Sequence, residues 1–173
     1  MNKINMILIA IVFLIILFVL GVVVVHVNDS FENQDTKVEE TNNIITLYYY
    51  NPAQDKDAAG NVLCSRDGLV GVMREIKLTS TPIHDAIRLL LRGELTQDER
   101  QRGITTEFPL SDVELKGANL NNGVLTLEFV DPQNKTSGGS CRAGILWFQI
   151  EATAKQFSGV REVRFIPEEL FQP

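Results

Sequence analysis

The residues that could carry out chemistry are scattered along this chain. A nucleophilic site needs a nucleophile, a base and an orienting group within reach of one another. The two histidines are His26, at the end of an apolar run, and His84, which precedes Asp85. The Ser-Gly-Gly-Ser run at 137–140 lacks the strand, turn and helix that present a nucleophilic serine. We therefore expect no enzyme: His84 and Asp85 predict a solvated pair, and the serine run predicts a flexible loop.

Neighbouring carboxylates are a second candidate, because two acids about 5–9 Å apart can hydrolyse glycosidic bonds. Three adjacent pairs occur: Glu39/Glu40, Asp98/Glu99 and Glu168/Glu169. They fall in a polar linker, a helix-capping turn and the C-terminal tail, and so predict solvated surface. Asp55, Asp57, Gly60 and Asn61 have the composition of a calcium loop, but their spacing fits no EF-hand. We expect neither a metal nor a cofactor.

Tyrosines offer a softer candidate for ligand binding. Tyr48 and Tyr50 alternate with Leu47 and Tyr49, so one of these pairs could face solvent on a strand. Exposed rings at Tyr48 and Tyr50 would form a surface that stacks on glycans. Packing in the core and against neighbouring strands is the alternative, and it is the more common position for such rings.

Cys64 and Cys141 are the only cysteines. An oxidising location outside the cytoplasm would permit a disulfide between them. That bond would close a long loop and stabilise the fold by about 4 kcal/mol in the chain-entropy model. Two independently buried thiols are the alternative.

The N-terminal run from Ile4 to Val27 is almost entirely apolar. About 20 apolar residues in a helix span roughly 30 Å, the thickness of the hydrocarbon core of a bilayer. Lys3 precedes the run and Asp29 and Glu32 follow it, so the positive-inside rule places the N-terminus in the cytoplasm and the rest outside. A cleaved signal peptide is the alternative, but the run is long and no Ala-x-Ala-like cleavage site follows it.

Composition divides the chain into three parts. Residues 1–27 predict a cytoplasmic stub and a transmembrane anchor, residues 28–43 a flexible acidic stalk, and residues 44–173 one extracytoplasmic domain. The formal net charge of -6 argues against nucleic acid as a partner.

The periodicity of the domain predicts an α+β fold with the order β-β-α-α-β-β-α-β. The expected elements are strands at 44–50 and 69–78, a helix at 82–93 capped by Thr81, a short helix after a Thr96–Glu99 capping box, a hairpin of 113–120 and 124–130 around Asn-Gly, a helix at 143–157 and a strand at 160–166. We expect one mixed sheet with the helices packed on one face.

Four segments, in this order and spacing, resemble the GerMN domain, the sporulation and spore germination domain. They are Leu47-Tyr48-Tyr49, the helix from Pro82 to Gly93 with the following 103–109 segment, the hairpin arm Gly123–Phe129 and the helix Gln149–Phe157 with Val160 and Val163. Two positions depart from the pattern of the family. Glu94 stands where proline is frequent, and Phe165-Ile166-Pro167-Glu168 replaces a strand that runs into Asp-Gly, which suggests a shortened end.

The resemblance implies a membrane-anchored module of the cell envelope, in some members tied to sporulation or germination, and it brings no catalytic residues. We expect a non-catalytic domain that binds another envelope protein or associates with itself. The alternative is a module that binds peptidoglycan or another glycan through exposed tyrosines and the loop at 51–67.

Overall fold

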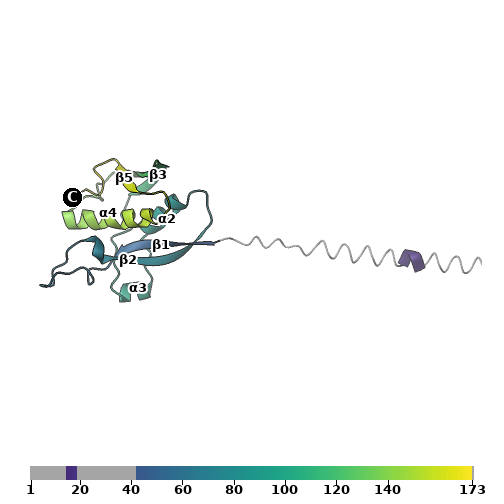
Figure 1. Ribbon diagram of the computed structural model, residues 1–173, viewed down its shortest axis with the longest axis horizontal. Coiled ribbons are helices and arrows are strands. Elements are labelled where there is room, and N and C mark those ends of the chain that lie inside the picture. The colour runs from purple at the N-terminus through teal and green to yellow at the C-terminus, as the bar shows by residue number, and fades with distance from the viewer. Residues whose placement is uncertain (1–14, 19–41, 173) are drawn as a thin grey trace, which may run out of the picture. The chain divides into compact units, whose positions relative to one another are not determined.

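The computed structural model describes residues 15–18 and 42–172 (Figure 1). Residues 15–18 are helical, and the rest of the predicted anchor and the stalk up to residue 41 lie outside the described residues. Within the described ranges, no helix has the length and apolar character needed to cross a membrane. Residues 42–172 form one compact unit with its own core.

The predicted order of elements is confirmed. The strands are β1 (Asn42–Tyr50), β2 (Leu69–Lys77), β3 (Glu114–Asn121), β4 (Val124–Val130) and β5 (Glu162–Ile166), and the helices are α2 (Pro82–Leu91), α3 (Gln97–Gln101) and α4 (Ser140–Lys155). A short 3-10 turn, η1 (Arg66–Gly68), precedes β2. Strand β1 begins two residues before the predicted strand, and α4 takes the last residue of the serine run into its first turn.

The expectation of a single mixed sheet is wrong, because the strands form two sheets. β1 and β2 make an antiparallel ribbon, and the second sheet has the order β3-β4-β5, with β4 and β5 parallel. Helices α2 and α4 run between them: α2 contacts β1 and β3, while α4 contacts β1 and β5 (Figure 1).

The edge of β1 explains why the two sheets stay separate. Side chains of Thr153 in α4 and of Gln156, the C-cap of α4, bond to the backbone groups that another strand would need. The amide of Gln156 accepts from the Thr46 N–H at 2.7 Å and donates to the Thr46 carbonyl at 2.7 Å. The Thr153 hydroxyl accepts from the Tyr48 N–H at 3.0 Å. Since a covered edge cannot pair, the helix ends the ribbon there.

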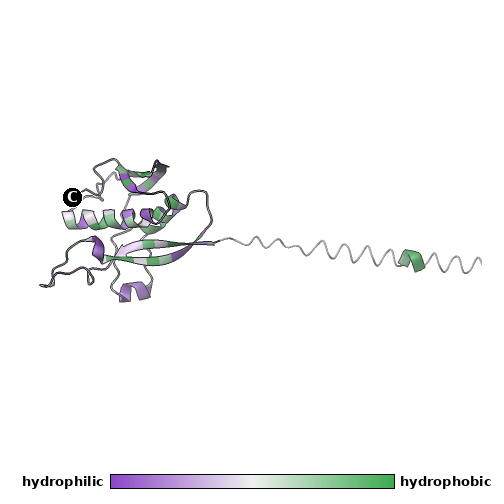
Figure 2. Ribbon diagram, viewed as in Figure 1, coloured by the Kyte–Doolittle hydropathy of each residue, from purple (hydrophilic) through white to green (hydrophobic). Residues whose placement is uncertain are grey.

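The core lies on both sides of the helix layer. Its fully buried side chains include Leu47, Ile87, Leu90, Leu127, Leu146 and Ile150, and Figure 2 shows the hydrophobic residues gathered on the helices and strands that enclose them, with α3 hydrophilic. The C-terminal tail adds Phe171, which is fully buried and packs on Phe129 and Phe165 at centroid distances of 5.3 and 4.9 Å. The tail is therefore part of the hydrophobic core.

Local signals set the turns and caps. Asn122 and Gly123 have φ of 48° and 84°, the left-handed pair of a tight hairpin turn. Thr96 and Glu99 form the predicted capping box at α3. Thr81 precedes α2 but makes no side-chain capping bond, because its hydroxyl instead donates to Asp85.

Candidate functional site

The two candidate tyrosines do not share a surface. Tyr48 is half-buried on the outer face of the ribbon, whereas Tyr50 is 4% exposed. Tyr50 ends its strand, and its ring packs so closely on Gly68 that a Cβ there would lie 2.3 Å from the ring. Its hydroxyl donates to Asp55. Burial raises the pKa of Tyr50 to about 12, and the bond to Asp55 adds to that shift.

The loop that covers Tyr50 is fixed by internal bonds. Asp55 accepts from the backbone N–H and hydroxyl of Ser65, at 2.6 and 2.7 Å, as well as from Tyr50. The bond from Tyr50 is the main reason that the pKa of Asp55 lies below its usual value. A disulfide joins Cys64 of the loop to Cys141 in the first turn of α4, with 5.2 Å between the Cα atoms. The loop therefore has a defined shape in the free domain.

The histidine, aspartate and serine candidates for catalysis or metal binding bond to nearby residues of their own turns and helix ends. His84 Nδ1 lies 3.6 Å from Asp85, whose carboxylate accepts from the Thr79 hydroxyl at 2.5 Å. Asp57 accepts from the backbone N–H groups of Ala59 and Asn61. The serine run ends in α4.

The carboxylate pairs are likewise placed apart. Asp98 pairs with Arg102 at 3.1 Å, and Glu99 pairs with Arg74 at 2.7 Å. Glu168 and Glu169 follow β5, while Glu39/Glu40 lie outside the described residues.

An exposed apolar surface lies on the outer face of the ribbon, and we call it the platform: Ile44, Thr46, Tyr48, Gly71 and Met73. Ile44 is 68% exposed and Met73 is 74% exposed. The Thr46 methyl and the Tyr48 ring both lie over Gly71, where a Cβ would meet them at 2.7 and 3.5 Å. Glycine therefore lets these side chains lie flat against the strand.

The sequence contains a signal for the platform in the residue types of β1. Positions 44 and 48 are as apolar as 45, 47 and 49, so β1 lacks the polar alternate face of a half-buried strand. A strand of this kind is expected to be covered on both faces. In the structure, its inner face packs on the core and the described residues leave the other face open.

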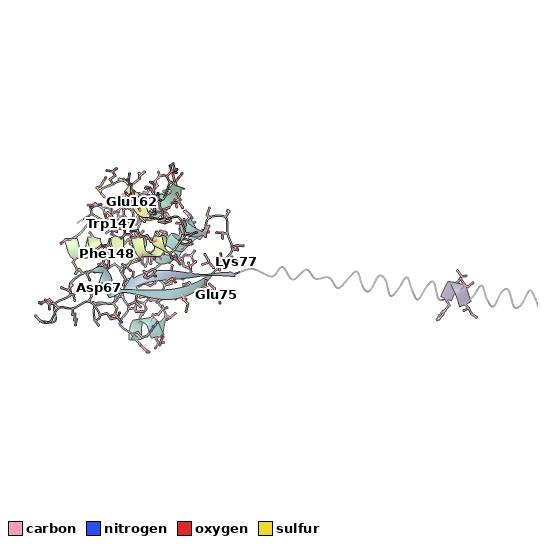
Figure 3. The ribbon with its side chains drawn as sticks, in the orientation of Figure 1. Asp67, Glu75, Lys77, Trp147, Phe148 and Glu162 are labelled. Atoms are coloured by element: carbon pink, nitrogen blue, oxygen red, sulfur yellow. A yellow bond between two sulfur atoms is a disulfide. The ribbon has the colours of Figure 1, made fainter. Side chains whose placement is uncertain are left out.

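A groove of about 600 Å³ runs beside β5 on another part of the domain. One wall is β5, the second is a stripe of α4 formed by Trp147, Glu151 and Lys155, and the C-terminal tail contributes Glu168 and Gln172. Figure 3 shows Trp147 on the side of Glu162 and Phe148 on the side of Asp67, in keeping with the contacts of Trp147 to Phe165 and of Arg66 to Phe148. The groove carries charges of both signs.

Comparison with known proteins places the domain. The family described as sporulation and spore germination, Germane, matches residues 46–168, which is most of the chain. The chain belongs to this family. No curated protein matches the chain. The family match confirms the resemblance to a GerMN domain that the sequence suggested. The match does not include the apolar run at 4–27, so the transmembrane anchor stays a prediction.

Several solved structures are similar to this Germane domain. The tandem GerMN domains of the sporulation protein GerM from Bacillus subtilis align with a TM-score of 0.50 and 20% identity, over 72% of this chain and 38% of that chain. The first GerMN domain of the same protein aligns with a TM-score of 0.47 and 15% identity, over 71% and 80%. At such identity the first match supports the fold alone.

Proposed function

We propose that this protein is a non-catalytic, membrane-anchored module whose domain lies outside the cytoplasm and binds another envelope protein. The apolar run at 4–27 and the charges that flank it support the anchor and the orientation. Membership of a sporulation and germination family supports an envelope role in those processes.

The platform is the observation that carries the proposal. Contiguous exposed apolar side chains on a soluble domain mark interaction sites. Ile44 and Met73 project from neighbouring strands that are paired in a regular register, so their positions are set before a partner arrives. A preformed apolar surface loses little conformational entropy on binding. The partner that it suits presents a flat apolar face with a basic or polar group near Glu75, which is exposed and lies opposite Ile44 on the same face.

Crosslinking of the full-length protein in its native cells, followed by mass spectrometry, tests this proposal. We expect one protein to be captured reproducibly. Met73→Glu and Ile44→Glu should each reduce its capture about tenfold, because a charge would be buried against an apolar face. Val130→Glu is the matched control, since Val130 is also exposed but lies on β4. Equal capture by all variants would refute the role of the platform.

Glycan binding is the alternative function, and the half-exposed ring of Tyr48 over Gly71 is the observation that favours it. Aromatic rings with one open face stack on sugars. In that case the domain would sediment with purified cell wall at low salt, and Tyr48→Ala would abolish this binding while Met73→Glu would not. An unbound domain at low salt would exclude glycan binding.

A further inference from the structure

The free edge of β5 has the properties of a strand-pairing site. Among the described residues, no strand pairs with the outer side of β5, which is the last strand in the order β3-β4-β5 and keeps a regular register with β4 from Glu162 to Ile166. The Glu162 N–H donates to the Gly123 carbonyl at 3.1 Å, on the side of β4. Because backbone groups alternate sides along a strand, Val163 and Phe165 present theirs to the open side.

The outer edges of β3 and β1 are protected, whereas β2, like β5, pairs with only one strand among the described residues. On β3 the register shifts between Leu115 and Gly117, and the bulged residue is Lys116. A bulge and a lysine are common devices that prevent edge pairing. The edge of β1 is covered by Thr153 of α4 and by Gln156, the C-cap of that helix. β5 has charged residues but no bulge, so it retains a regular edge.

The groove leaves space for an additional strand beside β5. Helix α4 extends under the edge, and its stripe of Trp147, Glu151 and Lys155 faces the space of about 600 Å³. Among the described residues, the buried indole N–H of Trp147 meets no acceptor. A strand added to β5 would cover this stripe and continue the sheet.

The charge pattern of β5 is complementary to a second, antiparallel copy of the same strand. Glu162 and Arg164 lie on the solvent face, where they pair with each other at 2.6 Å and are 52% and 63% exposed. In an antiparallel pair of two β5 strands centred on Val163, each Glu162 would lie opposite Arg164 of the second copy. A centre at Glu162 or at Arg164 would instead oppose like charges, which is unfavourable.

We infer that two copies of this protein associate through antiparallel pairing of their β5 edges, centred on Val163, which joins their three-stranded sheets into one. The β5 edge is a different surface from the platform, so this inference goes beyond the proposed function. The two Val163 residues would exchange their backbone hydrogen bonds. Both copies, anchored in one membrane, would meet at a high effective concentration.

Cysteine crosslinking of full-length protein tests the pairing. Two differently tagged copies are expressed together, one with Glu162→Cys and the other with Arg164→Cys. Opposed residues of such a pair have Cα atoms about 4.5 Å apart, within the range for a disulfide. We expect a linked mixed dimer that exceeds either like pair. The pair Lys116→Cys and Asn119→Cys on β3 is the control and should stay unlinked.

Charge exchange provides a second readout. Glu162→Arg or Arg164→Glu alone should weaken association about tenfold, and the two together should restore it. These exposed residues contribute little to folding, which a thermal melt of each variant verifies. Absence of the mixed dimer, or single variants that associate as well as the wild type, would overturn the inference. If platform-dependent capture of another protein persists in that case, the proposed function still stands; if capture also fails, both fail.

Discussion

Replacing Glu99 by Gln should destabilise the domain in a way that depends on pH. Arg74 of β2 forms a bidentate salt bridge with Glu99 of α3, in which two guanidinium nitrogens each lie 2.7 Å from a carboxylate oxygen. Glu99 also accepts from the Thr96 N–H at 2.8 Å. The bonds from Arg74 are the main reason that the pKa of Glu99 falls from 4.5 to about 2. The pair holds α3 against the ribbon that carries the platform.

The size of the effect follows from the pKa. A shift from 4.5 to about 2 corresponds to about 3 kcal/mol of the free energy of unfolding at pH 7. The Arg74 side chain is 20% exposed, so water screens part of this, and we expect Glu99→Gln to cost about 2 kcal/mol. For a domain of this size that lowers the Tm by about 6–10 °C.

The sign of the pH dependence is fixed by the direction of the shift. Because the folded-state pKa is lowered, the stabilisation is present above about pH 4.5 and is lost as the pH falls towards 2. The difference between wild type and Glu99→Gln should therefore shrink over this range. Other carboxylates with lowered pKa values, such as Asp85, contribute to both proteins and cancel.

Thermal and chemical denaturation followed by circular dichroism, at several pH values, measures this difference. The matched control is Asp98→Asn on the same helix. Asp98 is 79% exposed and its partner Arg102 is 56% exposed, so the change should stay within about 0.5 kcal/mol. The reasoning is refuted if both variants lose equal stability, or if the loss in Glu99→Gln is the same at pH 7 and pH 2.5.

Three further predictions concern the disulfide, the tyrosines and the covered edge. Cys64→Ser with Cys141→Ser should lower the free energy of unfolding by about 4 kcal/mol, measured in guanidinium; a loss that reductant reproduces in the wild type would agree, and no loss would contradict it. In an ultraviolet titration, burial should keep Tyr49 and Tyr50 from ionising until about pH 12, so their contribution to stability is present below pH 10 and is lost as the pH rises to 12; earlier ionisation in the folded domain would show that the rings are open to water. Gln156→Ala should cost about 1 kcal/mol and speed hydrogen exchange at the Thr46 N–H, and unchanged exchange would mean that the edge is not covered in solution.

Local patterns predicted the elements well because the forces that set them act over a few residues. The Asn-Gly dipeptide at 122–123 specified the hairpin turn, since both residues adopt positive φ there. The Thr96–Glu99 capping box likewise depended only on residues within one turn of helix. The cap expected at Thr81 was wrong, because the hydroxyls of Thr79 and Thr81 both donate to the carboxylate of Asp85 instead.

Burial of the tyrosines was less predictable. The alternation of residues 47–50 suggested that Tyr48 and Tyr50 would share a face, but Tyr50 ends its strand and pairs through its backbone with Thr105 at 2.7 and 3.2 Å. The loop at 51–67 then closes over its ring. The groove beside β5 gave no sequence signal, because it requires α4 and β5 to come together.

The sequence by itself determined the order of strands and helices, the family and the position of the apolar N-terminal run, since each depends on residue type and short spacing. Only the tertiary structure decided that the strands form two sheets and that residues 42–172 leave the platform open and the outer edge of β5 free. Those outcomes depend on bonds between residues far apart in the chain, such as Tyr48 with Thr153, 105 residues apart. No local pattern encodes such a bond, because it exists only once the helix has packed against the strand.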